Sequence, residues 1–222
     1  MVFDLETTGV DPHNDLPVSA ALLEHRTESL CDTETYFLID PGCDIPQDAT
    51  TVHGITTDQV RKDGVSLHAA VEQLYDAIST FNGSIAGMNI SYDFTVLDAV
   101  STAELGVGLP DMLNVLDILV IDRHFNKYRK GSRKLGDLAN AYGITQTNAH
   151  NALGDVITTA KILEVMLGLY PELTELDSAK LTNMQKKWHF EWATEYSDWL
   201  KRQGRKPLPE SERCWPVKRN RC

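Results

Sequence analysis

The chain has 222 residues, of which 42% are hydrophobic and 24% are charged, and its formal net charge is −11. This composition is ordinary for a globular chain that can bury a core, and it excludes collagen-like, disulfide-scaffold and wholly disordered proteins. Positive charge is unevenly divided, because residues 171–222 hold 11 Lys and Arg against 8 Asp and Glu, whereas the remainder holds 10 against 24. The acidic body argues against binding nucleic acid by bulk electrostatics, and the basic end is either a contact surface or a solvated helical face.

The first residues carry neither the basic nor the apolar stretch of a signal peptide. No apolar run approaches the roughly 18 residues that a membrane span needs. The four cysteines form no CxxC pair, and reduced thiols are expected. We therefore expect a cytoplasmic protein with no membrane partner, built from one domain of α/β size and an appendage.

Turn residues and apolar patterns predict strands in the first part of the chain. The three strands are Val2–Leu5, Val18–His25 and Tyr36–Ile39, separated by the Pro, Gly, Asn and Asp clusters typical of a meander. Apolar residues at helical spacing then predict a helix from Ser66 to Phe81, with Gly83 as its stop.

Strands and helices alternate through the middle of the chain. Strands are predicted at Ser84–Met88 and at Val115–Ile121, the second interrupted by Asp117. Helices are predicted at Phe94–Leu105, Leu135–Tyr142 and Asp155–Leu169. This order indicates a mixed sheet flanked by helices.

The character of the chain changes after Pro171. One more helix is predicted from Asn183 to Gln203, rich in tryptophan, and Arg205–Cys222 is predicted to be irregular. Two interpretations stay open for this part. It is either a flap that stacks on bases and contacts phosphates of single strands, or an amphipathic helix that buries its tryptophans against the core.

Acidic residues stand at three junctions between predicted elements. Asp4 and Glu6 are two apart on the first strand, so their side chains leave the same face. Asp93 follows a strand at the start of a helix, and Asp155 opens a later helix, five residues after His150. Taken singly, these residues could be solvated strand-end charges, helix N-caps or an ordinary loop histidine.

Clustered carboxylates repel one another, which raises their pKa values, and a divalent cation relieves that repulsion. Hard cations such as Mg²⁺ and Mn²⁺ prefer oxygen ligands. Two such ions can clamp the attacking and leaving oxygens of a phosphodiester displacement, and histidine is the natural general base near physiological pH.

Four segments in this order resemble motifs of one family. They are F-D-L-E-T-T-G at 3–9, H-G-I-T at 53–56, N-I-S-Y-D at 89–93 and H-N-A-L-G-D at 150–155. The chain resembles the DnaQ-like DEDDh 3′→5′ exonucleases, which include the proofreading epsilon subunit of bacterial DNA polymerase III. Its end resembles extensions on stand-alone exonucleases of actinobacteria and their phages.

The resemblance implies a ribonuclease H-like α/β fold over residues 1–170, with a central mixed five-stranded sheet flanked by helices, and a C-terminal helical extension over residues 171–222. It implies that four carboxylates hold two Mg²⁺ or Mn²⁺ ions and that His150 deprotonates the attacking water. The metal ligands are Asp4, Glu6, Asp93 and Asp155. The candidates for substrate binding are Thr7, Thr8, His53 and Asn89.

The resemblance further implies release of nucleoside 5′-monophosphates from the 3′ ends of single-stranded or frayed DNA. RNA ends are an alternative substrate, a DNA polymerase is a candidate partner, and a non-catalytic polymerase-associated module is the alternative of another class. Two positions depart from the family pattern. Met88 replaces a usual histidine in the second motif, and Gly154 replaces a usual aspartate in the third, but neither change touches the five residues assigned to chemistry.

Overall fold

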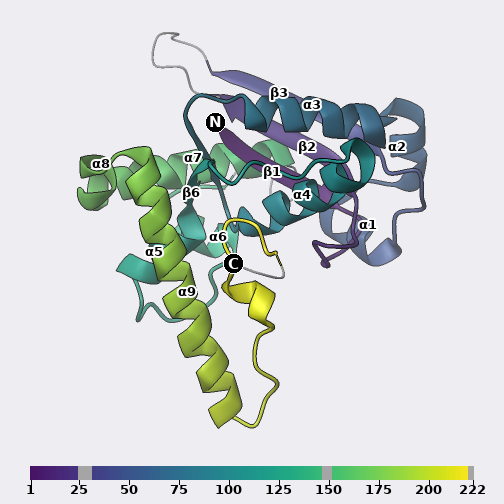
Figure 1. Cartoon of the computed structure of the whole chain (residues 1–222). Helices are drawn as coiled ribbons and strands as arrows, with labels where there is room; N and C mark the ends of the chain where they lie inside the picture. Colours follow the sequence, from purple (N-terminus) through teal and green to yellow (C-terminus); the bar gives the residue numbers. More distant parts are fainter. Residues whose placement is uncertain (25–31, 147–151, 220–222) are drawn as a thin grey trace.

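The computed structural model describes residues 1–24, 32–146 and 152–219 and contains a mixed sheet between layers of helices (Figure 1). The sheet order is β4-β3-β2-β1-β5-β6. The strands are β1 (Val2–Thr7), β2 (Pro17–Glu24), β3 (Thr33–Asp40), β4 (Val65–Ser66), β5 (Ser84–Gly87) and β6 (Asn114–Asp117).

Strand direction places the ends of three strands at one edge. β1 pairs antiparallel with β2, which pairs antiparallel with β3, so the predicted meander is confirmed. β1 pairs in parallel with β5, and β5 with β6. The carboxyl ends of β1, β5 and β6 therefore lie at the same edge of the sheet, where β5 leads into α4 and β6 into α5, while β1 leads into the turn before β2.

Helices cover both faces of the sheet. α3 and α4 pack together on one face, and α7 packs on the other against β1 and β2 (Figure 1). The helices are α1 (Gln47–His53), α2 (Thr57–Asp63), α3 (Leu67–Ser79), α4 (Ser91–Leu105), α5 (Ile118–Phe125), α6 (Leu135–Ala141), α7 (Ala152–Leu169), α8 (Glu172–Glu175), α9 (Ser178–Arg202) and the single 3₁₀ turn η1 (Glu210–Arg213).

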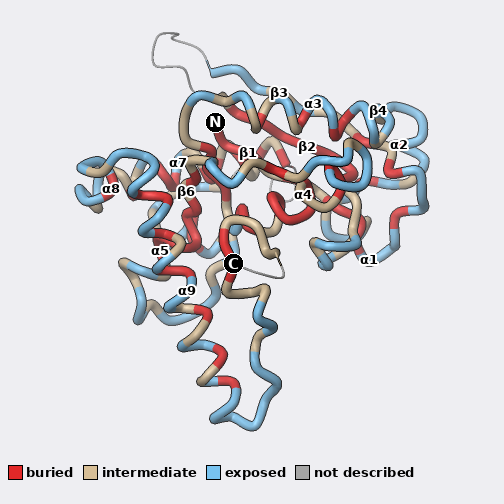
Figure 2. The backbone as a smooth tube through the Cα atoms, in the orientation of Figure 1, coloured by how far each residue is buried: buried red, intermediate tan, exposed pale blue. Residues whose placement is uncertain are grey.

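The core lies between the sheet and these helices (Figure 2). Phe3 and Leu5 of β1 are buried in it together with Phe94 of α4 and Ile162 of α7. Phe3 and Leu5 alternate with Asp4 and Glu6 along β1, which is a central strand of the sheet. The same alternation that fixes β1 in the core therefore fixes the two carboxylates on one face.

Two sequence predictions about secondary structure need correction. The apolar run Val115–Ile121 is not one strand, because β6 ends at Asp117, whose side chain accepts a hydrogen bond from the Leu119 backbone and caps α5. The sheet has six strands rather than five, because Val65–Ser66 pairs with the edge of β3. A strand of two residues is too short to leave a periodic signal.

The segment after Pro171 is docked on the sheet through α9. β6 is an edge strand, and polar side chains of α9 satisfy its outward backbone groups. Thr182 accepts a hydrogen bond from Val115 N at 2.8 Å, and Gln185 bonds both Asp117 N and Val115 O, at 2.8 and 2.7 Å. An unpaired edge invites association with another strand, so α9 closes a surface that would otherwise be open.

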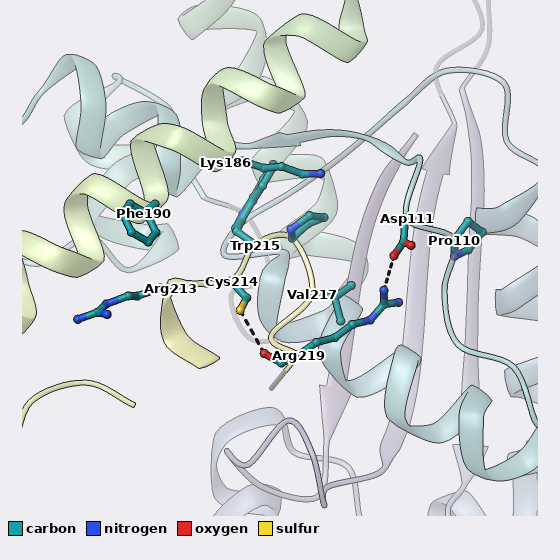
Figure 3. A pocket seen from close by; sticks show the side chains of 10 residues that line it. Pro110, Asp111, Lys186, Phe190, Arg213, Cys214, Trp215, Val217 and Arg219 are labelled. Atoms are coloured by element: carbon teal, nitrogen blue, oxygen red, sulfur yellow. Dashed lines mark hydrogen bonds and ion pairs between the residues drawn. The ribbon is translucent and has the colours of Figure 1, made fainter. Parts of the chain in front are cut away.

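The C-terminal tail returns to the body beside α4 (Figure 3). Trp215 is buried and donates its indole hydrogen to Asp117 at 3.3 Å, and Arg219 forms ion pairs with Asp98, at 2.7 Å, and with Asp111. A hollow of about 500 Å³ remains between the tail and α9. Cys43 is a free thiol but Cys214 is disulfide-bonded, so the expectation of reduced cysteines is wrong for Cys214. CxxC spacing detects only neighbouring cysteines, whereas folding can pair others.

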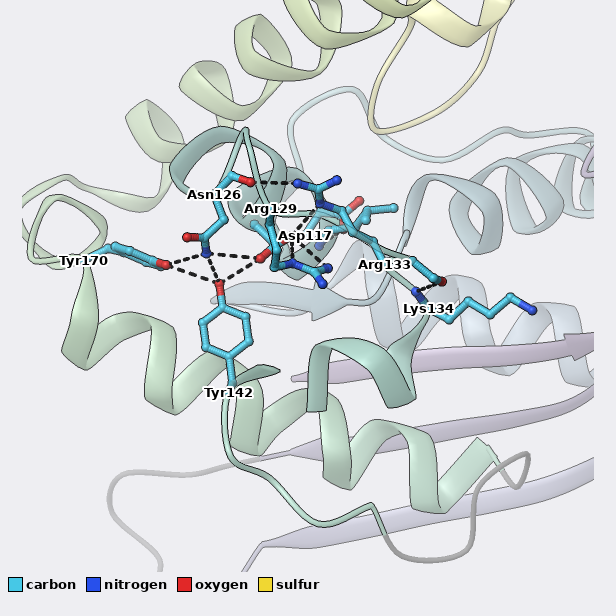
Figure 4. A network of polar contacts seen from close by, with 10 residues as sticks. Asp117, Asn126, Arg129, Arg133, Lys134, Tyr142 and Tyr170 are labelled. Atoms are coloured by element: carbon cyan, nitrogen blue, oxygen red, sulfur yellow. Dashed lines mark hydrogen bonds and ion pairs between the residues drawn. The ribbon is translucent and has the colours of Figure 1, made fainter. Parts of the chain in front are cut away.

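A buried carboxylate organises the junction of α5, α6 and α7 (Figure 4). The Asp122 side chain is fully buried, and Arg133 Nε reaches its Oδ2 at 2.7 Å, with Arg129 at 3.4 Å. Tyr142 and Asn126 donate to Oδ1, at 3.0 and 3.2 Å.

We expect Asp122→Ala to lower the free energy of unfolding by about 3–5 kcal/mol, because it leaves buried partners without their carboxylate. Urea unfolding measures this loss. Glu164→Ala, which removes an exposed carboxylate on α7, is the control and should change the free energy by less than about 0.5 kcal/mol. An Asp122→Ala protein as stable as the control would contradict the prediction.

No described helix is both long and apolar enough to cross a membrane.

Candidate active site

Three carboxylates from distant parts of the chain meet beside β1. Asp4 and Glu6 leave the same face of β1, and α7, which packs on that strand, carries Asp155 in its first turn. One oxygen from each of the three side chains can be chosen so that all lie within 4.8 Å of one another, and all three residues are partly exposed. The structure thus brings together three of the four residues that the resemblance implies as metal ligands.

Asp93 joins the group from the other side of β1. It lies in the first turn of α4, is 4% exposed, and accepts a hydrogen bond from Leu5 N at 2.9 Å. This bond ties the start of α4 to the backbone between Asp4 and Glu6. Asp93 is not one of the three residues whose oxygens can lie within 4.8 Å of one another, but after burial its charge is the next cause that raises the pKa of Asp4.

Burial and mutual repulsion raise the pKa values of these carboxyl groups. Burial, followed by the charges of Asp93, Glu6 and Asp155, raises the pKa of Asp4 well above its usual value. Burial and the Asp155 charge raise the pKa of Glu6 to about 7. Burial raises the pKa of Asp93 to about 8, against hydrogen bonds from the backbone that lower it. The group therefore resists carrying its full negative charge alone.

This donor set fits a divalent metal ion. The ligand atoms are hard oxygens on three or four side chains, which suits Mg²⁺ or Mn²⁺ better than a site built from sulfur and nitrogen. A cation would offset both the burial and the repulsion that raise the three pKa values. Partial exposure of Asp4, Glu6 and Asp155 leaves a route for ion and substrate.

The predicted histidine of the H-G-I-T segment lies at the same site. His53 ends α1 and lines a hollow of about 220 Å³ together with Glu6, Tyr36 and Ala152 at the start of α7. Its Nδ1 accepts from Ile55 N at 3.0 Å, and its buried Nε2 has no hydrogen-bond partner among the described residues. Burial lowers the pKa of His53, with a hydrogen bond to the Thr7 backbone acting in the opposite sense.

The T-T-G turn after β1 is held by its own hydrogen bonds. Thr7 Oγ1 lies 2.7 Å from the Tyr92 hydroxyl, and Thr8 Oγ1 donates to Asp15 at 2.9 Å. Both threonines are 7% exposed. A Cβ at Gly9 would lie 2.6 Å from the Asp15 carboxylate, which explains the glycine. The two side chains therefore hold the turn in place.

Asn89 stands at the same strand-end edge with an exposed side chain and a left-handed backbone, φ 58°. Its N–H donates to Asp117 Oδ1 at 3.0 Å. Asp117 also accepts hydrogen bonds from Leu119 N and from the indole nitrogen of Trp215. This buried carboxylate at the end of β6 therefore fixes the turn that carries Asn89. No contact joins Asn89 to the four carboxylates within the described part of the chain.

The predicted general base, His150, lies outside the described residues. Sequence reasoning missed two residues that border the site. Gln146 donates to Asp155 Oδ1 at 2.9 Å, and Tyr36 of β3 lines the hollow beside Glu6. Neither residue could be predicted from the sequence, because a single Gln in a loop and a single Tyr in a strand belong to no motif.

The tryptophans of the C-terminal segment divide into a buried pair and a partly exposed stack. Trp188 and Trp215 are buried at 8% and 6% exposure. Trp192, Tyr196 and Trp199 instead form a stack along α9, with ring centroids 5.5 and 5.7 Å apart, and Trp199 is 41% exposed. Arg123 lies over Trp192 at 3.4 Å and anchors the inner end of the stack.

Fold and site together define a ribonuclease H-like α/β protein with an acidic, metal-compatible centre beside its central strand. The chain belongs to the exonuclease family, whose sequence profile matches residues 1–163.

Known proteins similar to this chain support the same assignment. Exodeoxyribonuclease I of Buchnera aphidicola is 26% identical over 78% of this chain and 47% of its own length. The 3′-5′ exonuclease DinG of Staphylococcus aureus is 25% identical over 95% of this chain and 23% of its own. E. coli exonuclease I in complex with a dA16 oligonucleotide superposes with a TM-score of 0.69 at 22% identity, over 78% of this chain and 42% of that one. The chain thus spans less than half the length of each.

Proposed function

We propose that this chain is a metal-dependent 3′→5′ exonuclease that releases nucleoside 5′-monophosphates from single-stranded or frayed DNA ends. The observation that carries the proposal is the convergence of Asp4, Glu6 and Asp155 within 4.8 Å, with Asp93 bound to the backbone between the first two. A module freed from catalysis has no need to keep such a costly cluster of like charges.

In this proposal Asp4, Glu6, Asp93 and Asp155 hold two Mg²⁺ or Mn²⁺ ions, which would supply charge stabilisation for a phosphodiester displacement. Gln146 orients Asp155 through its hydrogen bond. His150, in the segment just before α7, is the proposed general base that takes the proton of the attacking water. Its motif position before Asp155 supports this role.

The terminal nucleotide would enter the hollow beside Glu6. His53 lines this hollow, and its buried Nε2, which has no hydrogen-bond partner among the described residues, can accept or donate a hydrogen bond. The turn of Thr7 and Thr8 offers backbone groups at the end of β1, and Asn89 offers an exposed amide at the end of β5. We propose these four residues as substrate contacts, with the backbone of the turn more important than its hydroxyls.

Two observations favour DNA as the substrate. The similar proteins include an exodeoxyribonuclease and an exonuclease bound to a DNA oligonucleotide. RNA ends are the alternative, since discrimination by the 2′-hydroxyl depends on the shape of the pocket. We further propose that residues 1–170 form the catalytic domain and that residues 171–222 are a docked extension. A DNA polymerase is a candidate partner, and co-purification tests it.

The test is digestion of a 5′-labelled single-stranded DNA oligomer with Mg²⁺, Mn²⁺ or EDTA, beside an RNA of the same sequence. We expect a metal-dependent ladder that shortens from the 3′ end, with DNA degraded faster than RNA. Faster loss of RNA would move the proposal to an exoribonuclease. No digestion of either by folded protein would favour the non-catalytic module.

A further inference from the structure

A strongly basic loop joins α5 to α6 in an otherwise acidic body. Residues 126–134 contain five cations and no acidic residue: Lys127, Arg129, Lys130, Arg133 and Lys134. Residues 1–170 contain only ten Lys and Arg in total, so half of them gather in nine positions. The positive charge of this otherwise acidic part of the chain is therefore concentrated in one loop.

Ion pairing within the protein accounts for only part of this charge. Arg129 and Arg133 share the single carboxylate of Asp122, and Lys127 pairs with Glu195 of α9 at 2.8 Å. Lys130 and Lys134 are exposed and form no ion pair within the described residues. Two acidic partners offset two of five positive charges, so a net charge of about three remains on the loop.

The loop also carries an aromatic side chain in water. Tyr128 is 89% exposed, among the most exposed large apolar side chains of the described chain. Gly131, at φ 94°, turns the chain between Lys130 and Arg133. Exposed cations interleaved with an exposed ring are the combination that binds single strands, because the cations meet phosphates and the ring stacks on a base.

Both ends of the loop lie on elements that reach the acidic site. Before it, α5 is capped by Asp117, whose charge acts on Asp93. After it, α6 packs against α7, the helix of Asp155, and leads to Gln146, which bonds that carboxylate. Figure 4 shows Arg129 and Arg133 reaching from this loop into the polar network that also contains Asn126 and Tyr142, while the Lys134 side chain extends away from the network.

We propose that loop 126–134 is a phosphate-binding arm that holds the DNA strand next to the acidic site through Lys130, Lys134 and Tyr128. Asp122 has a positioning role, because it fixes the two arginines and with them the course of the loop. The inference rests on the proposed exonuclease function and adds to it the surface that holds the strand. The net negative charge of the body repels phosphates, and a local basic arm would attract them despite that charge.

The test measures binding of fluorescently labelled oligo(dT) in EDTA by anisotropy, over a range of KCl concentrations. For Lys130→Ala/Lys134→Ala we expect weaker binding and a plot of log affinity against log salt that is shallower by about 0.7 per lost contact, or about 1.4 in all. Lys130→Arg/Lys134→Arg should restore the wild-type slope. Lys62→Ala/Lys161→Ala, which removes two exposed lysines of α2 and α7, is the matched control and should leave the slope unchanged.

Tyr128→Ala tests stacking separately. It should weaken binding about fivefold or more without changing the salt slope, and Tyr128→Phe should bind as wild type does. In digestion assays the double lysine variant should raise KM for the oligomer more than it lowers kcat. If wild-type protein digests DNA but the lysine variants bind with the wild-type salt slope, the proposed phosphate-binding arm is contradicted, while the proposed exonuclease function is not. If wild-type protein neither binds nor digests DNA, the proposed function itself fails.

Discussion

Replacing Asp4 or Asp155 with alanine is expected to lower the rate of nucleotide release by about 10³-fold or more, equivalent to about 4 kcal/mol of transition-state stabilisation. Each change removes one of the three oxygens that lie within 4.8 Å, so the remaining carboxylates can no longer hold the ions in place. The rate is measured by gel-resolved digestion at saturating Mg²⁺.

Loss of activity must be separated from loss of structure. Because Asp4 is partly buried among like charges, its removal relieves repulsion, and the metal-free variant should unfold at a temperature no lower than that of the wild type. Glu34→Ala, which removes an exposed carboxylate on β3 of the same sheet, should keep full activity. A folded Asp4→Ala protein that still releases nucleotides at the wild-type rate would remove the acidic cluster from catalysis.

The metal-free protein is expected to lose stability as the pH rises from 5 to 9. Glu6 and Asp93 have folded-state pKa values of about 7 and about 8, and the pKa of Asp4 is also raised, whereas the unfolded carboxyl groups titrate near 4. Between these values the folded state keeps protons that the unfolded state has lost. The stabilisation is therefore complete below about pH 4 and disappears as the pH passes through the folded-state values.

Divalent metal should reverse this trend, because it binds the deprotonated carboxylates of the folded state. The increase of the unfolding temperature on adding Mg²⁺ should consequently be larger at pH 8 than at pH 5. Differential scanning fluorimetry with EDTA or MgCl₂ measures both profiles. Glu6→Gln should flatten the metal-free profile near pH 7, whereas Glu34→Gln should not. A metal-free profile that rises with pH, or an Mg²⁺ effect independent of pH, would contradict the assignment of these carboxylates.

Local patterns predicted most of the long elements. The alternation of apolar residues with Asp4 and Glu6 gave β1, and the helical spacing between Ser66 and Phe81 gave α3. The failures arose where the pattern was short or uniform. The apolar run Val115–Ile121 has no polar residue except Asp117, so periodicity could not show that a strand ends there and a helix begins. The helices α1 and α2, of seven residues each, also escaped prediction.

The candidate site was predictable to a similar degree. Motif order pointed to the carboxylates of β1, α4 and α7, and geometry brings them together. Gln146 and Tyr36 could not be found, because their importance lies only in what they face. Which of the C-terminal tryptophans are buried and which are exposed could not be predicted either, because helical spacing does not say which side of α9 packs against the rest of the protein.

The sequence by itself determined the residue types, their order and the face of β1 on which Asp4 and Glu6 stand, because these follow from local covalent geometry and the period of a strand. Only the tertiary structure decided that Asp155 comes within 4.8 Å of them, that α9 closes the edge of β6, and that a basic loop lies on elements bordering an acidic site. Those facts depend on contacts between residues far apart in the chain, which are fixed when the core packs and do not follow from the local geometry of any one segment.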